Sequence, residues 1–208
     1  MVMISGVITG DIVNSSQLSE EEHKTCLHQI EQMISKLNDS FDARGDVFRG
    51  DEFQVFVPNP KNALRCAVLL RLTLMTSVKS ADARVSVGIG EYKDIEDELR
   101  KTARGEAFEL SGRTLNNMEE ERLKVTLPKT NELKLETQLL VKYLDFIITG
   151  LSEKQAEVLL PRILSPELTQ EKLSEKTGIK RRSLASRLQR SNATLILDTL
   201  DVLENTLI

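Results

Sequence analysis

Two aspartates lie in strand-like segments where a carboxylate needs a partner. Asp11 interrupts the apolar run of residues 6–13, and a charge inside a buried strand is costly unless it is paired or binds a cation. Asp51 follows Gly50 between two runs rich in Val and Phe, the pattern of a β-hairpin whose turn carries carboxylates. We therefore predict that Asp11 and Asp51 meet on adjacent strands and hold a divalent metal, with the Ile12 carbonyl as a further ligand.

Magnesium (or manganese) suits such a pair of carboxylates. Mg²⁺ needs only one or two protein carboxylates, and water and phosphate fill its other positions. The alternative, in which Asp11 caps a turn and Asp51 fills a hairpin tip, stays open from the spacing alone.

A basic segment near the C-terminus contrasts with the net charge of −4 of the whole chain. Residues 169–177 are predicted to form a short helix that Thr169 caps and Gly178 ends, and a basic helix follows directly. This is the spacing of a helix-turn-helix, whose second helix reads base edges in the major groove while flanking cations contact phosphates. The alternative is a protein-binding helical hairpin with a solvated basic face. The predicted DNA contacts are Gln170, Lys180, Arg181, Arg182, Ser183, Ser186, Arg187 and Arg190.

Composition indicates an ordinary globular protein. The chain has 208 residues, of which 40% are hydrophobic and 29% charged, enough for one sizeable domain or two modest ones. Cys26 and Cys66 are far apart in sequence, which favours reduced, buried thiols. The N-terminus lacks a signal-peptide pattern, and no stretch reaches the roughly 20 apolar residues of a membrane helix. We expect a cytoplasmic protein with no membrane partner.

The order of the predicted elements defines a fold class. Apolar spacing predicts a strand at 3–14, a helix to about 37, a hairpin at 47–57, a second helix from Pro60, a strand at 83–90, a helix at 105–118 and a short strand at 123–127. This is the split βαβ, ferredoxin-like pattern of an α+β domain, with one extra helix and strand. Beyond Pro128 the patterns are all helical. The expected division is an α+β domain at 1–128, a connecting helix at 129–150 and an all-α helix-turn-helix DNA-binding domain at 151–208.

Several short motifs resemble those of the SatD family of bacterial proteins: residues 9–15, 50–54, 84–90 and 105–108, followed by the helix-turn-helix. The Gly-Asp-Ile step and residues 49–53 also look like the palm fold of class III nucleotidyl cyclases and GGDEF-type domains. The resemblance covers most of the chain. It implies a cyclase-like palm whose metal-binding aspartates fall on Asp11 and Asp51.

The cyclase resemblance is incomplete at the other functional positions. The asparagine and arginine that stabilise the transition state in cyclases fall on Glu109 and Arg113, so the arginine is kept as the one catalytic candidate and a glutamate replaces the asparagine. Arg113 has an alternative role as the partner of Glu109 one helical turn away. The purine-selecting positions fall on Val47, in place of a lysine, and on Thr102. The predicted nucleotide contacts are Arg49, Gly50, Glu52, Thr102, Gly105 and Glu109.

These features lead to three functional hypotheses. The first is a bacterial DNA-binding regulatory protein whose palm domain binds a nucleotide and Mg²⁺ as a sensor. The second is an active nucleotidyl cyclase-like enzyme that acts on a nucleoside triphosphate by two-metal chemistry, and the third is an inert palm that serves only dimerisation. Whether the chain is an enzyme stays open. We expect a homodimer, because cyclase-like sites form between palms and helix-turn-helix modules bind DNA better in pairs.

Overall fold

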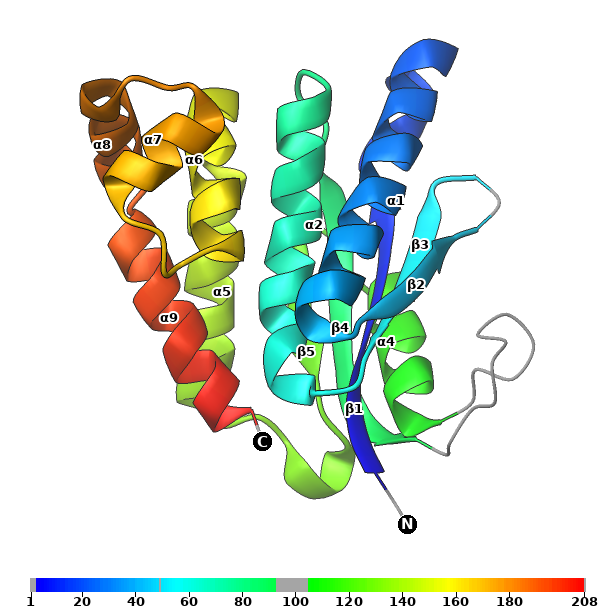
Figure 1. Ribbon diagram of the computed structural model, residues 1–208. Coiled ribbons are helices and arrows are strands. Elements are labelled where there is room, and N and C mark those ends of the chain that lie inside the picture. The colour runs from blue at the N-terminus through cyan, green and yellow to red at the C-terminus, as the bar shows by residue number, and fades with distance from the viewer. Residues whose placement is uncertain (1–2, 49, 93–104, 208) are drawn as a thin grey trace.

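A five-stranded sheet forms the centre of the α+β fold (Figure 1). The computed structural model describes residues 3–48, 50–92 and 105–207. The sheet order is β2-β3-β1-β4-β5, and β5 alone pairs in parallel, with β4. The strands are β1 (Met3–Ile12), β2 (Arg44–Val47), β3 (Glu52–Val57), β4 (Ala83–Tyr92) and β5 (Leu123–Thr126).

Two helices cover one face of the sheet and a third covers the other. The first four strands, with α1 (Glu20–Phe41) and α2 (Ala63–Ser77), follow the order of a ferredoxin-like unit. Helix α4 (Glu106–Asn116) packs on the opposite face against β4 and β1, and leads to β5. The predicted ferredoxin-like domain with one additional helix and strand is therefore confirmed.

Strand alternation separates two cores. Ile8 of β1 and Val55 of β3 belong to the large core under α1 and α2. Their neighbours Val7 and Phe56 pack with Phe108 on the α4 side. Because successive side chains point to opposite faces, the odd-numbered residues of β1, including Asp11, lie on the α4 side.

Local capping signals set the helix starts as predicted. The Ser19 side chain accepts a hydrogen bond from the Glu22 amide, and the Glu22 carboxylate accepts one from the Ser19 amide, which is a capping box. At the start of α6, the Ser152 amide and hydroxyl both donate to the Gln155 side-chain oxygen, at 2.8 and 2.7 Å. Short 3₁₀ turns at Ser15–Gln17, Pro60–Asn62 and Lys129–Asn131 join other elements.

Five helices follow the sheet: α5 (Leu135–Thr149), α6 (Glu153–Leu164), α7 (Gln170–Thr177), α8 (Arg181–Arg190) and α9 (Ala193–Thr206). They stand beside α2, on the side away from α1 (Figure 1). Pro161 lies inside α6, and the helix continues past it to Leu164. Elsewhere the observed ends differ from the predicted ones by a few residues, as at β1 and α5.

The C-terminal helices share one core with the sheet. Leu173, Leu184 and Leu188 of the helix pair α7–α8 belong to the same buried cluster as the residues under α1 and α2. Arg65 of α2 adds a polar link, since its guanidinium bonds Glu204 at 2.6 Å and Asp201 at 2.8 Å, both on α9. The predicted boundaries at 128 and 150 therefore cross a continuous apolar interior.

A buried ion network joins α2, β4 and α5. Arg71 of α2 is fully buried and donates to Asp82, directly before β4, at 2.7 and 3.0 Å, and to Asp145 of α5 at 2.7 Å. The Arg122 side chain bonds Asp82 at 3.1 Å, and its amide bonds Asp145 at 3.0 Å. Thr149 accepts a further bond from Arg71. Each buried charge thus has an opposite charge and hydrogen bonds, as burial requires.

The two thiols are free and buried, as expected for Cys26 and Cys66. Burial raises the pKa of both. None of the described helices is both long enough and apolar enough to cross a membrane.

Candidate functional site

A row of polar side chains crosses the α4 side of the sheet. Thr9 of β1 stands opposite Gln54 of β3 and Ser86 of β4, and Asp11 stands opposite Glu52 and Arg84. The alternation of β4, with apolar residues at 83, 85 and 87 and polar ones between, puts Arg84 and Ser86 on this face.

The Thr9 end of this row is closed by α4. The Thr9 and Ser111 hydroxyls hydrogen-bond at 2.8 Å, and Gln54 donates to the Thr9 hydroxyl at 3.1 Å. Ser86 donates to the Ser111 carbonyl. Gly88 lets the α4 backbone approach, since a Cβ there would lie 2.3 Å from the Ala107 carbonyl oxygen. This end is a packed, satisfied contact between helix and sheet.

At the Asp11 end, Asp11 and Arg84 form a bidentate ion pair. Arg84 donates from Nε to Oδ1 of Asp11 at 3.1 Å and from Nη2 to Oδ2 at 2.5 Å. Its third nitrogen, Nη1, donates to the Met118 carbonyl at 3.2 Å. The Asp11 side chain is 17% exposed and that of Arg84 35%, so the pair lies at the surface of the sheet and is reachable from solvent.

Asp51 lies beside this pair at the end of the β2–β3 hairpin. The Ile12 amide donates to the Asp51 carbonyl at 3.3 Å, and Glu52 is the register partner of Asp11. The hydrogen bond to Asp11 raises the pKa of the Arg84 guanidinium, and the charges of Asp11 and Asp51 raise it further. The fold therefore places Asp51 next to Ile12 in the neighbouring strand, while Asp11 pairs with Arg84.

The arrangement does not fit a metal held between the two aspartates. Both carboxylate oxygens of Asp11 are bonded to Arg84. Among the described residues, no group of three or more His, Cys, Asp or Glu side chains could hold a metal ion. In this arrangement Arg84 supplies the positive charge that the sequence argument assigned to Mg²⁺.

The predicted pair on α4 faces away from the sheet. The helix buries Ala107, Phe108 and Ser111 against the strands. Glu109 and Arg113 are 74% and 69% exposed and form a loose ion pair at 3.9 Å. The structure thus places Arg113 beside Glu109 and does not bring either residue to Asp11.

The other predicted nucleotide contacts are only partly described. Gly50 has a φ of +96°, a left-handed conformation that favours glycine, and Glu52 is exposed. Gly105 precedes α4 and bridges to Tyr92. Arg49 and Thr102 lie outside the described residues.

Helices α7 and α8 carry the predicted DNA contacts. The Thr169 side chain caps α7 by accepting from the Lys172 amide, and Gly178 ends the helix with a φ of +69°. Ser174 donates to the Ile179 carbonyl at 2.6 Å, which ties α7 to the turn before α8. Leu184 and Leu188 are the buried residues of α8 and lie on its inward side.

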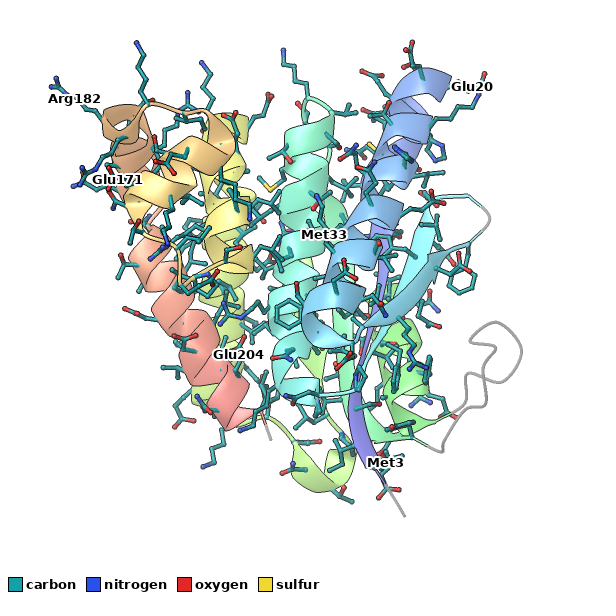
Figure 2. All side chains as sticks on the ribbon, in the orientation of Figure 1. Met3, Glu20, Met33, Glu171, Arg182 and Glu204 are labelled. Atoms are coloured by element: carbon teal, nitrogen blue, oxygen red, sulfur yellow. The ribbon has the colours of Figure 1, made fainter. Side chains whose placement is uncertain are left out.

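The basic side chains of this region fall into two groups. Lys180, Arg181 and Arg182 are exposed at the start of α8, and Figure 2 shows Arg182 pointing away from the protein. Arg187 instead pairs with Glu157 of α6 at 2.6 Å, and Arg190 bonds the Ser186 hydroxyl and carbonyl. Gln170 is exposed at the start of α7, and Ser183 and Ser186 are half-buried.

Two features of the site were not predicted from the sequence: Arg84 as the partner of Asp11, and the polar contact of Thr9 and Ser86 with Ser111 of α4. A signal for Arg84 was present, because an arginine within a strand of alternating apolar residues needs a nearby carboxylate. Identifying which carboxylate required the strand register.

Fold and site together define a ferredoxin-like α+β protein with a paired acidic site at one end of β1 and five C-terminal helices, of which α6 and α9 pack on α2. The SatD family model matches residues 6–207, and the chain belongs to the SatD family. The predicted family is thus confirmed. No curated protein matches the chain.

Three solved structures that overlap part of the chain are cyclases. A bacterial light-regulated adenylyl cyclase aligns at 16% identity and a TM-score of 0.44, covering 61% of this chain and 43% of the cyclase chain. The active GGEEF domain of a diguanylate cyclase from Vibrio cholerae aligns at 13% and 0.39, covering 60% and 83% of the two chains. The guanylyl cyclase Cya2 aligns at 16% and 0.41, covering 62% and 77%.

Proposed function

We propose that this protein is a regulator that binds duplex DNA through α7 and α8. The observation that carries the proposal is the local charge: residues 170–190 contain seven Lys or Arg and two Glu in a chain of net charge −4. Concentrated positive charge on one helical unit attracts the DNA backbone, and phosphate contacts supply most of the affinity.

The geometry of the helix pair suits this role. A short first helix, a turn through a left-handed glycine and a second helix with an exposed basic start are the parts of a helix-turn-helix. Lys180, Arg181 and Arg182 can reach DNA without breaking an intramolecular bond. Arg187 and Arg190 are held by Glu157 and Ser186, so we expect them to contribute less.

Fluorescence anisotropy with a labelled 30-base-pair duplex tests the proposal. We expect Arg181→Ala/Arg182→Ala to weaken binding and to reduce the slope of log K against log salt by about 2, one unit for each lost phosphate contact. Lys79→Ala is the control. Lys79 is exposed just after the C-terminal end of α2 and outside α7 and α8, so this change should leave both the affinity and the salt slope unchanged. If wild-type protein causes no change in the anisotropy of the duplex at low salt, the proposal is ruled out.

A nucleotide-sensing role for the α+β domain is a second candidate. The observation in its favour is geometric: Asp11, paired with the solvent-reachable Arg84, lies one residue from Ile12, whose amide donates to the carbonyl of the sequence-distant Asp51. Thermal-shift measurements with each nucleoside triphosphate and Mg²⁺ or Mn²⁺ test it, because specific binding raises the melting temperature by mass action.

The same mixtures, analysed by chromatography, distinguish the remaining alternatives. Turnover that Asp51→Ala abolishes would favour a cyclase-like enzyme, with Arg113 of a second copy acting on the phosphates, because within one chain Arg113 faces away from Asp11. A melting shift without turnover would favour a sensor. Neither effect, with a stable dimer by sedimentation, would favour an inert domain used for dimerisation.

A further inference from the structure

A groove of about 490 Å³ runs along the outer edge of β5. All five successive residues from Leu123 to Leu127 line it. Because side chains alternate between the faces of a strand, a groove that touches five successive residues follows the strand's edge and not one face. Thr114 of α4 and Val141 of α5 lie on its two sides.

The outward main-chain groups of β5 are unpaired among the described residues and border this groove, although Leu123 and Val125 as whole residues are only 2% and 6% exposed. β5 is the last strand of the sheet, and the Val85 amide donates to the Arg122 carbonyl at 2.9 Å. By alternation, the main-chain groups of Lys124 and Thr126 face β4, and those of Leu123 and Val125 face outward. No described residue hydrogen-bonds these outward amides and carbonyls. Such an edge can pair with another strand.

Apolar and charged side chains both line the groove. Its apolar residues include Leu110, Leu127 and Leu133. Its charged residues, called the rim below, are the cations Arg113, Lys124, Lys129 and Lys142 and the carboxylates Glu121 and Glu132.

Two of the rim cations are available to a partner. Glu121 pairs with Lys124 at 3.5 Å, whereas Lys129 and Lys142 are exposed and make no ion pair with any described residue. The rim is thus positive in a chain whose net charge is −4, which favours an acidic partner.

We propose that β5 binds an extended segment of a partner protein, in which acidic and apolar residues alternate, as a sixth strand of the sheet. Main-chain bonds to Leu123 and Val125 supply affinity, apolar side chains enter the groove, and acidic side chains meet Lys129 and Lys142. A strand flanked by helices is a recurrent form of peptide recognition by strand addition. β5 has four residues, so it pairs with a segment of roughly 13 Å.

The charges argue against a second copy of this chain as the occupant. Two β5 edges related by a two-fold axis would bring Lys124 and its flanking cations against the same residues of the other copy. Like charges opposite each other destabilise strand pairing. An acidic segment meets no such repulsion.

Fluorescence anisotropy with a fluorescein-labelled hexapeptide of alternating Glu and Val tests the proposal. We expect it to bind, and a Lys/Val peptide not to bind. Lys129→Glu/Lys142→Glu should weaken binding about tenfold, since each exposed ion pair contributes modestly. The control Lys36→Glu reverses an exposed charge on α1 and should change affinity less than twofold. Unchanged melting temperatures show that the variants are folded.

Hydrogen exchange provides a readout specific to strand addition. The peptide should protect the amides of Leu123 and Val125, and N-methylation of its Val residues should abolish both protection and binding. No binding of the Glu/Val peptide at millimolar concentration, or binding that survives N-methylation, would overturn the proposal. Amide protection that rises with protein concentration alone would also overturn it, because a second copy of the chain would then occupy the groove. Protection by decanoate but not by the peptide would overturn it too, because the occupant would then be a small amphiphilic acid.

Discussion

At the scale of single residues, the charge of Asp11 decides what the acidic site can bind. Its two oxygens are held by Arg84 in a geometry that suits guanidinium and carboxylate groups. A divalent cation at Asp11 would therefore compete with an arginine that is already in place. Asp51, one residue before the register partner of Asp11, makes no ion pair with any described residue.

We predict that Arg84→Gln lowers the free energy of unfolding by about 1–3 kcal/mol, because it leaves a partly buried carboxylate without its charged partner. If the site accepts a metal once Arg84 is removed, 5 mM MgCl₂ should raise the melting temperature of Arg84→Gln more than that of the wild type. Asp11→Asn/Arg84→Gln is the control and should lose this difference. An equal Mg²⁺ effect on all three proteins would show that the carboxylates do not form a metal site.

At the scale of elements, α4 is held on the sheet by close backbone approach at Gly88. A Cβ at that position would lie 2.3 Å from the Ala107 oxygen and 2.6 Å from the Ser111 nitrogen. These are main-chain atoms, which cannot move without shifting the helix. The Thr9–Ser111 bond depends on the same approach.

Gly88→Ala is therefore expected to destabilise the protein by roughly 2–3 kcal/mol through overpacking. Gly112→Ala is the control: Gly112 lies on α4 itself, where an added Cβ meets nothing within 4 Å. It should stabilise the protein by about 0.4–1 kcal/mol, because alanine favours the helix. Urea unfolding followed by circular dichroism measures both, and a neutral Gly88→Ala would refute the packing argument.

At the scale of the whole molecule, the sheet and the C-terminal helices form one cooperative body in our interpretation. The apolar core is continuous between them, and the Arg71 network ties α2 and β4 to α5. Two separately folding domains would lack such an interior.

We expect one unfolding transition for the two parts. The chain has two tyrosines, Tyr92 on β4 and Tyr143 on α5, so Tyr143→Phe leaves a reporter in the sheet and Tyr92→Phe leaves one in the helices. In each variant, the urea midpoint measured by tyrosine fluorescence should equal the midpoint measured by far-ultraviolet circular dichroism. Fluorescence that changes at a different urea concentration from the circular dichroism would instead support independent domains.

Removing one partner of the buried network tests its contribution. Asp145→Asn should cost roughly 3–5 kcal/mol, because Arg71 keeps its charge in the interior with one fewer carboxylate. Asp198→Asn, an exposed position on α9, is the control and should stay within about 0.5 kcal/mol of the wild type. A small effect of Asp145→Asn would show that the remaining carboxylate of Asp82 suffices.

The amino-acid sequence by itself determined the strand and helix order, the ferredoxin-like class, the SatD membership, the caps at Ser19, Ser152 and Thr169, and the neighbourhood of Asp11 and Asp51. These features follow from local periodicity, capping chemistry and short motifs, which act over a few residues. The tertiary structure alone decided that Arg84 neutralises Asp11, that Arg113 faces solvent, and that Leu173, Leu184 and Leu188 join the common core. Those outcomes depend on strand register and on which helix face meets the sheet, and both are set by packing between segments far apart in the chain.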